Sequence, residues 1–325
     1  MFKVAALLAQ ALLVMAALAA SQAGWTQTYP DRPVKLIVGF APGGTNDILA
    51  RLVAPRLQEH LKQPFVVENK PGAASMVAAE FSANAPPDGY TLFVASSGAL
   101  TINPAIYSKI NYDPVNDFTP VALLGSFPLV LTVNSASSIK DLKGLIEAGK
   151  RAPNGSIDHG VGSSTFQLAA EVFGRDTGVK FNHIPYKGTG PTVTALLSGE
   201  IQMAIVDIAA IVPLVNSGRL RALAVTTAAR SAVLPDVPSV AEGGVKGYDV
   251  FIWTGLVVPK RTPAEVSVRL RTALKEILAE KDVAVRLRAL GMEPGHTDSA
   301  AFARQISADL ARWSAVAKAA NIKAD

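Results

Sequence analysis

Short apolar runs alternate along this chain with longer stretches in which apolar residues recur at helical spacing. Residues 34–40 are nearly continuous in apolar character, which is typical of a buried strand. Between Ile48 and Leu61 the apolar residues recur three or four positions apart, which predicts a helix, and Pro55 should kink or break it. Strands at 65–69 and 91–95 then enclose a helix at 75–83. This alternation predicts an α/β fold with largely parallel sheets.

The same pattern resumes after a loop region at 103–120. We expect strands at 129–133, 157–160, 181–184, 203–206 and 222–226, and helices at 138–150, 165–173, 192–197 and 209–215. Ser137 or Ser138 should cap the first of these helices. A passage rich in Pro and Gly, at 235–247, is interpreted as the segment through which the chain returns to the lobe formed by its N-terminal elements. The last expected elements are a strand at 251–258 and helices at 263–279, 282–290 and 299–320.

Chain length and this order of elements together predict two lobes. The chain has 325 residues, which suits two compact α/β lobes better than one small core. We expect one lobe to combine residues 24–125 with residues 246–325, and the other to contain residues 126–245.

The N-terminus predicts an export signal. Lys3 is followed by an apolar run that ends at Ala20, and Ser21-Gln22-Ala23 supplies the small residues that a signal peptidase reads. The alternative is a membrane anchor, but the run is short for a bilayer. We therefore expect residues 1–23 to be a cleaved signal, after which the protein is soluble.

Composition excludes several classes of site. The chain has no cysteine, so disulfides, thiolate metal sites, a cysteine nucleophile and a lipoprotein anchor are ruled out. The net charge of +5 is scattered without a basic run, which argues against a nucleic-acid surface. The four histidines are isolated in sequence, and no dinucleotide or phosphate-loop fingerprint is complete, so no metal and no cofactor is expected.

Four loops of small and polar residues follow predicted strands, and three of them lead directly into helices. They are residues 40–47, 96–98, 160–165 and 186–191. Free N–H groups and the positive dipole end of a helix favour anions, and ligands of open α/β sheets bind at the C-terminal ends of strands. Each loop could equally be an ordinary capped turn. Because the four loops come from both predicted lobes, they favour an anion site in a cleft between the lobes.

Several motifs place the chain in a known family. Tyr29-Pro30-Asp31-Arg32-Pro33, the stretch 40–47, Asn69-Lys70-Pro71-Gly72 and the stretch 87–92 resemble the Bug family, the substrate-binding proteins of tripartite tricarboxylate transporters. Residues 185–188, 220–226 and 234–238 continue the similarity in the same order. The resemblance implies a two-lobed periplasmic flytrap that delivers a small carboxylate to integral membrane transporter subunits. A monomer is expected on architecture alone.

By position, the resemblance implies that loops from both lobes hold a ligand carboxylate. The residues concerned are Gly43, Gly44, Thr45, Asp47, Ser96, Ser97, Ser163, Ser164, Thr165, Lys187, Gly188, Thr189 and Asp207. Asp207 would orient water or select a ligand amino group. Phe166-Gln167 and residues 205–208 depart from the family pattern, so the ligand of a relative is not transferable.

Two other functions fit the same sequence. One is a sensory binding protein whose closed form is recognised by a membrane receptor. The other is an exported hydrolase that uses Ser164 as nucleophile and His159 as base, with Asp158 as the orienting acid. A structural role for His159 is the preferred interpretation, and we expect a binding protein rather than an enzyme.

Overall fold

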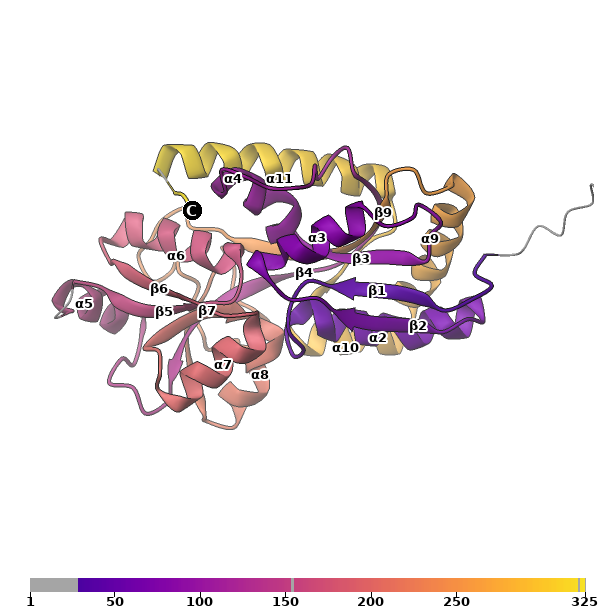
Figure 1. Ribbon diagram of the computed structural model, residues 1–325. Helices are drawn as coiled ribbons and strands as arrows, with labels where there is room; N and C mark the ends of the chain where they lie inside the picture. The colour runs from indigo at the N-terminus through magenta and orange to yellow at the C-terminus, as the bar shows by residue number, and fades with distance from the viewer. Residues whose placement is uncertain (1–28, 153–154, 321, 325) are drawn as a thin grey trace, which may run out of the picture. The chain divides into compact units, whose positions relative to one another are not determined.

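The computed structural model describes residues 29–152, 155–320 and 322–324 (Figure 1). The predicted signal segment, residues 1–23, lies outside the described residues. Residues 32–325 form one compact unit.

The first part of the sheet is parallel. β1 (Val34–Val38) lies between β2 (Phe65–Asn69) and β3 (Thr91–Ser96) and runs parallel to both. α2 (Thr45–Leu61) connects β1 to β2, and α3 (Met76–Ala83) connects β2 to β3. The apolar residues of β1 are fully buried, as the continuous apolar run predicts for a strand covered on both faces.

Two long antiparallel strands join the halves of the sheet. β9 (Phe251–Pro259) pairs with β3 on one side and with the first part of β4 (Phe118–Asn134) on the other. The second part of β4 pairs with β7 (Met203–Asp207) and β8 (Leu220–Val225). The boundary expected after residue 125 therefore falls inside a continuous strand, because β4 contributes to both halves.

The second half repeats the strand-to-helix pattern. β5 (Ile157–Val161) pairs in parallel with β6 (Phe181–Pro185) and with β7. Three helices each begin within four residues of the end of a strand: α6 (Ser164–Thr177), α7 (Thr189–Ser198) and α8 (Ile208–Asn216). Their N-termini therefore point to the edge where the parallel strands end.

The C-terminal helices return to the first half. α9 (Ala264–Ala279) contacts α2 and α10 (Lys281–Ala289), and α10 also contacts the short strand β10 (Glu293–Pro294). α11 (Ser299–Ala320) runs across β4, the π-helical turn η2 (Gly98–Ile102) and α4 (Asn103–Ile106), and its end reaches α6 (Figure 1). A search of the described helices finds none with the length and apolar character needed to cross a bilayer.

Aromatic side chains fill the core of the first half. Trp253 is buried edge-to-face against Phe302, with ring centroids 5.1 Å apart, and its indole Nε1 donates to Asp309 at 2.7 Å. Phe93 packs against Phe118 at 5.9 Å. These contacts connect β3, β4, β9 and α11, so the core depends on chain segments far apart in sequence.

One local expectation was wrong, and a second was wrong in part. α5 (Leu142–Arg151) begins later than expected, because the carboxylate of Asp141, and not Ser137 or Ser138, caps it by accepting the Gly144 N–H at 2.7 Å. Pro55 does not break α2, which runs without interruption through it. Proline removes one backbone donor, and packing against β2 and α9 compensates for the missing bond.

Candidate functional site

The helices that follow β1, β5, β6 and β7 begin around one small buried cavity. Its volume of about 20 Å³ is enough for about one water molecule. Its walls come from both halves of the sheet: Phe40, Gly44, Thr45, Asn46, Ser96, Ser97, Gly162, Ser163, Thr165, Phe166, Thr189, Asp207 and Ile252. Backbone amides at helix starts and several hydroxyl groups therefore meet in one enclosed space, an arrangement suited to an anion.

Direct hydrogen bonds connect the two halves at this cavity. Asp207 Oδ2 accepts the backbone N–H of Thr45 at 3.3 Å and the Thr189 hydroxyl at 2.6 Å. Nearby, the Ala41 N–H donates to the Lys187 carbonyl at 2.9 Å. The first N–H of α2 is thus occupied by a carboxylate that lies 162 positions away along the chain.

Asp207 is a buried acid in an environment that disfavours its charge. Its pKa is raised because burial removes the carboxylate from water, and this outweighs the hydrogen bonds from Thr189 and from Thr45. Asp207 precedes α8, yet its side chain makes no cap hydrogen bond to that helix. Its carboxyl group is therefore directed to the cavity and not to its own helix.

Glycines allow the close approach of the loops. A Cβ at Gly44 would lie 3.4 Å from the Thr189 hydroxyl and 3.8 Å from Asp207 Oδ2. A Cβ at Gly162 would come within 2.7 Å of the Gly188 backbone, which a real side chain does not tolerate. Gly43 has a φ of +95°, a conformation that favours glycine.

Asp47 stabilises the loop 40–47 from the side away from the small cavity. Its carboxylate accepts the Gly43 N–H at 3.1 Å, the Asn69 amide at 3.0 Å and the Arg51 Nε at 3.0 Å. Burial would raise the pKa of Asp47, but these donors outweigh burial and hold it below its ordinary value. Asp47 therefore shapes the turn, and the cavity wall is formed by its neighbours Thr45 and Asn46.

A larger cavity of about 530 Å³ adjoins the small one and shares Gly162 and Ser163 with it. Its other walls include Tyr107, Ser164, Gln167, His183 and Lys187, together with the loop 72–74. The hydroxyl of Ser164 is buried and has no hydrogen-bond partner among the described residues. This cavity offers room and polar groups beside the enclosed one.

The structure distributes the predicted site residues over three positions. The small cavity is lined by Gly44, Thr45, Ser96, Ser97, Ser163, Thr165, Thr189 and Asp207. Ser164 and Lys187 line the larger cavity. Gly43, Asp47 and Gly188 line neither, because they hold the turns behind these walls.

Sequence reasoning missed five residues of the small cavity: Phe40, Asn46, Gly162, Phe166 and Ile252. Phe40, Asn46, Gly162 and Phe166 lie inside or beside loops that the strand-end pattern had already identified. Ile252 comes from β9, and no local signal relates that strand to the cavity; only the pairing of β9 with β3 and β4 brings it there.

The hydrolase hypothesis does not agree with the position of His159. His159 is fully buried; its Nε2 accepts the Ile205 N–H at 3.2 Å, and its Nδ1 lies 3.0 Å from Nδ1 of His183. Both ring nitrogens are therefore engaged away from Ser164. Across the residues the structure describes, no cluster of His, Cys, Asp and Glu has the arrangement of a metal site.

Comparisons with known proteins identify a family for this chain. Residues 49–322 match the model of the tripartite tricarboxylate transporter family receptor, TctC. The protein BugT of Bordetella pertussis is 35% identical over 299 residues, which cover 91% of each chain.

Solved structures are similar as well. An R. palustris protein solved with adipate is 38% identical, with a TM-score of 0.87 over 91% of this chain and 99% of the other. MatC from Rhodopseudomonas palustris with bound malate is 32% identical, with a TM-score of 0.85 over 89% of this chain and 99% of the other.

The fold and these similarities agree. The α/β architecture is that of the TctC-type periplasmic solute-binding proteins, and the family and its solved members are binding proteins, not enzymes. The chain belongs to the tripartite tricarboxylate transporter receptor family, TctC, which includes the Bug proteins.

Proposed function

We propose that this protein captures a small carboxylate-bearing solute in the periplasm and delivers it to the membrane subunits of a tripartite tricarboxylate-type transporter. The observation that carries the proposal is the convergence of four helix starts and several hydroxyl groups on one cavity built from both halves of the sheet. Such groups replace the water around an anion, and burial strengthens their hydrogen bonds. The adipate and malate bound to the two similar proteins support a carboxylate as the solute.

Solute entry requires the two halves to separate. A volume of about 20 Å³ is too small for an organic acid. Separation would break the hydrogen bonds from Thr45 to Asp207 and from Ala41 to Lys187. Closing again around the solute is the hinge motion typical of periplasmic binding proteins. The adjoining cavity of about 530 Å³ would receive the part of the solute beyond its carboxylate.

A thermal-shift screen tests the proposal. The mature protein is heated with adipate, malate and other small carboxylates, and in parallel with the corresponding amides. A ligand that binds the native state raises the melting temperature by mass action, and we expect a shift for at least one acid and none for its amide. Equal shifts with an acid and its amide, or no shift with any acid after removal of co-purified ligand, would contradict the proposal.

A matched pair of variants locates the site. Gly44→Val places a side chain against Thr189 and Asp207, so it should abolish the shift. Ala136→Val adds an apolar branch on an exposed loop away from the cavity and should leave the shift unchanged. Retained binding in folded Gly44→Val protein would remove this loop from the site.

Delivery to a transporter requires a separate test, since a sensory protein would use the same pocket. Deletion of the gene should abolish cellular uptake of the acid found in the screen. If uptake persists and only a transcriptional response to the acid disappears, the sensory role is the correct one.

A further inference from the structure

We propose that Asp207 enters the solute complex as a carboxylic acid and donates its proton to the solute carboxylate, so that each solute is bound together with one proton. The inference rests on the proposed function, because it assumes a carboxylate in the small cavity. It adds a chemical role for one residue and a dependence of binding on pH.

The charge balance of the cavity is the first argument. Among the residues that line it, Asp207 is the single ionisable side chain, and no Lys, Arg or His is present. A solute carboxylate would therefore meet another carboxylate without a cation to pair with either. Two carboxylates that share a site in a low dielectric hold one proton between them, because both cannot ionise at close distance.

The geometry of Asp207 is the second argument. Its side chain is nearly inaccessible to solvent, with an exposed fraction of 6%. The Thr45 amide and the Thr189 hydroxyl both donate to Oδ2. Gly44 lies against this carboxyl group: a Cβ added at Gly44 would lie 3.8 Å from Oδ2. An anion at the start of α2 is therefore a direct neighbour of Asp207.

Charged groups on the surrounding elements do not neutralise this pair. On α2, Asp47 is already bonded to Arg51. Lys187, which precedes α7, is exposed and lines the larger cavity. On β5, the buried His159 accepts a hydrogen bond from Ile205, so that nitrogen carries no proton. β4, β9, α7 and α8 contain no ionisable residue.

The remaining titratable groups near the site are engaged elsewhere. His183 on β6 bonds to Glu171 on α6 at 2.8 Å, and Asp158 on β5 accepts from Asn182. When the two halves are closed, burial raises the pKa of Asp207, and a second carboxylate acts in the same direction. The proton comes from solvent when the solute binds, and no covalent bond is made or broken.

Calorimetric titration with adipate and malate measures the proton directly. Titrations are performed at several pH values, each in two buffers of different ionisation enthalpy. We expect uptake of about one proton per solute where free Asp207 is ionised, and a Kd that rises about tenfold per pH unit in that range.

The Asp207→Asn variant tests the assignment. Its amide N–H₂ donates the same hydrogen bond without a titrating proton, so binding should lose both its proton uptake and its pH dependence. Asp309→Asn is the matched control: it removes another buried acid with a raised pKa, bonded to Trp253 outside the cavity, and should bind with the proton uptake of the wild type.

The outcomes separate the two proposals. Binding with proton uptake that disappears only in Asp207→Asn supports the inference. Binding of the acids without proton uptake at every pH tested overturns it and leaves the proposed function intact. Equal uptake by wild type and Asp207→Asn has the same meaning. If no carboxylate of the thermal-shift panel binds the wild type, the proposed function is wrong and the inference falls with it.

Discussion

At the scale of single residues, backbone strain is concentrated in the loop between β2 and α3. Ala73, Ala74 and Ser75 have φ values of 44°, 51° and 75°, and Gly72 precedes them at 151°. The left-handed conformation costs an L-residue about 1–2 kcal/mol. The Asn103 amide donates to the Ala74 carbonyl at 3.0 Å and helps to hold this geometry, and residues 72–74 form part of the wall of the larger cavity.

Ala74→Gly should therefore stabilise the protein. Glycine adopts a φ of 51° without steric cost, so we expect the free energy of unfolding to rise by about 1 kcal/mol. Urea denaturation followed by circular dichroism measures this change. Ala308→Gly, at an exposed position inside α11, should instead lower the free energy of unfolding by about 1 kcal/mol. A loss of stability in Ala74→Gly would show that the loop carries no strain at this residue.

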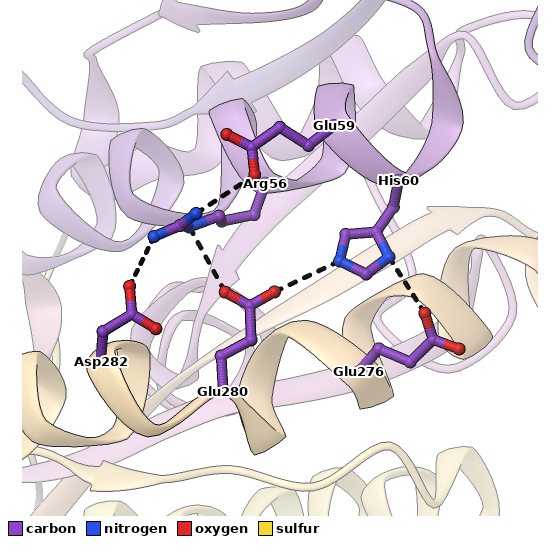
Figure 2. Close-up of polar contacts among 6 residues, drawn as sticks. All are labelled: Arg56, Glu59, His60, Glu276, Glu280 and Asp282. Atoms are coloured by element: carbon purple, nitrogen blue, oxygen red, sulfur yellow. Dashed lines mark hydrogen bonds and ion pairs between the residues drawn. The ribbon is translucent and has the colours of Figure 1, made fainter.

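At the scale of elements, a network of charged side chains ties α2 to the junction of α9 and α10. Figure 2 shows Arg56 reaching Glu59, Glu280 and Asp282, and His60 placed between Glu276 and Glu280. The two ring nitrogens of His60 lie 3.0 Å and 3.2 Å from the two glutamates. Shared partners make this a network and not a set of isolated surface pairs, whose contribution to stability is small.

Arg56→Met should lower the melting temperature, because it keeps the aliphatic stem but leaves three carboxylates of the network without this partner. Arg151→Met is the control: its ion pair with Glu147 is exposed and isolated, so the melting temperature should not change. Differential scanning calorimetry compares the two. Equal melting temperatures for wild type and Arg56→Met would mean that α2 is held by apolar packing alone.

At the scale of the whole unit, β4 prevents the halves of the sheet from being independent. One end pairs with β9 and the other with β7 and β8. Loss of either half would leave the backbone donors and acceptors of the same strand unpaired. The expected lobes are therefore segments of one connected sheet, whatever motion opens them for the solute.

Residues 32–325 should accordingly unfold in one transition. We expect the calorimetric and van't Hoff enthalpies to agree, as in a two-state protein. In residues 32–325 the wild-type tryptophans, Trp253 on β9 and Trp313 on α11, report on these two elements, and a Phe181→Trp substitution adds a signal from β6 in the other half. Coincident fluorescence transitions in Phe181→Trp protein and in the wild type would support the prediction. Two resolved transitions would contradict it.

The sequence by itself determined the local elements and the ends of strands where polar loops lie. Continuous apolar runs identify β1 and β3, because a buried strand needs apolar residues on both faces. Small polar residues after strands identify most of the walls of the small cavity, because a helix start needs caps and free amides. The family, too, follows from motifs spread along the chain.

The tertiary structure decided what depends on distance in space. The extension of β4 across both halves arises from its pairing with β9, and local propensity does not specify it. Pro55 remains inside α2 because tertiary packing outweighs one lost hydrogen bond. The contact between Asp207 and the Thr45 amide joins residues 162 positions apart, so only the folded chain could show that a buried acid faces the anion site.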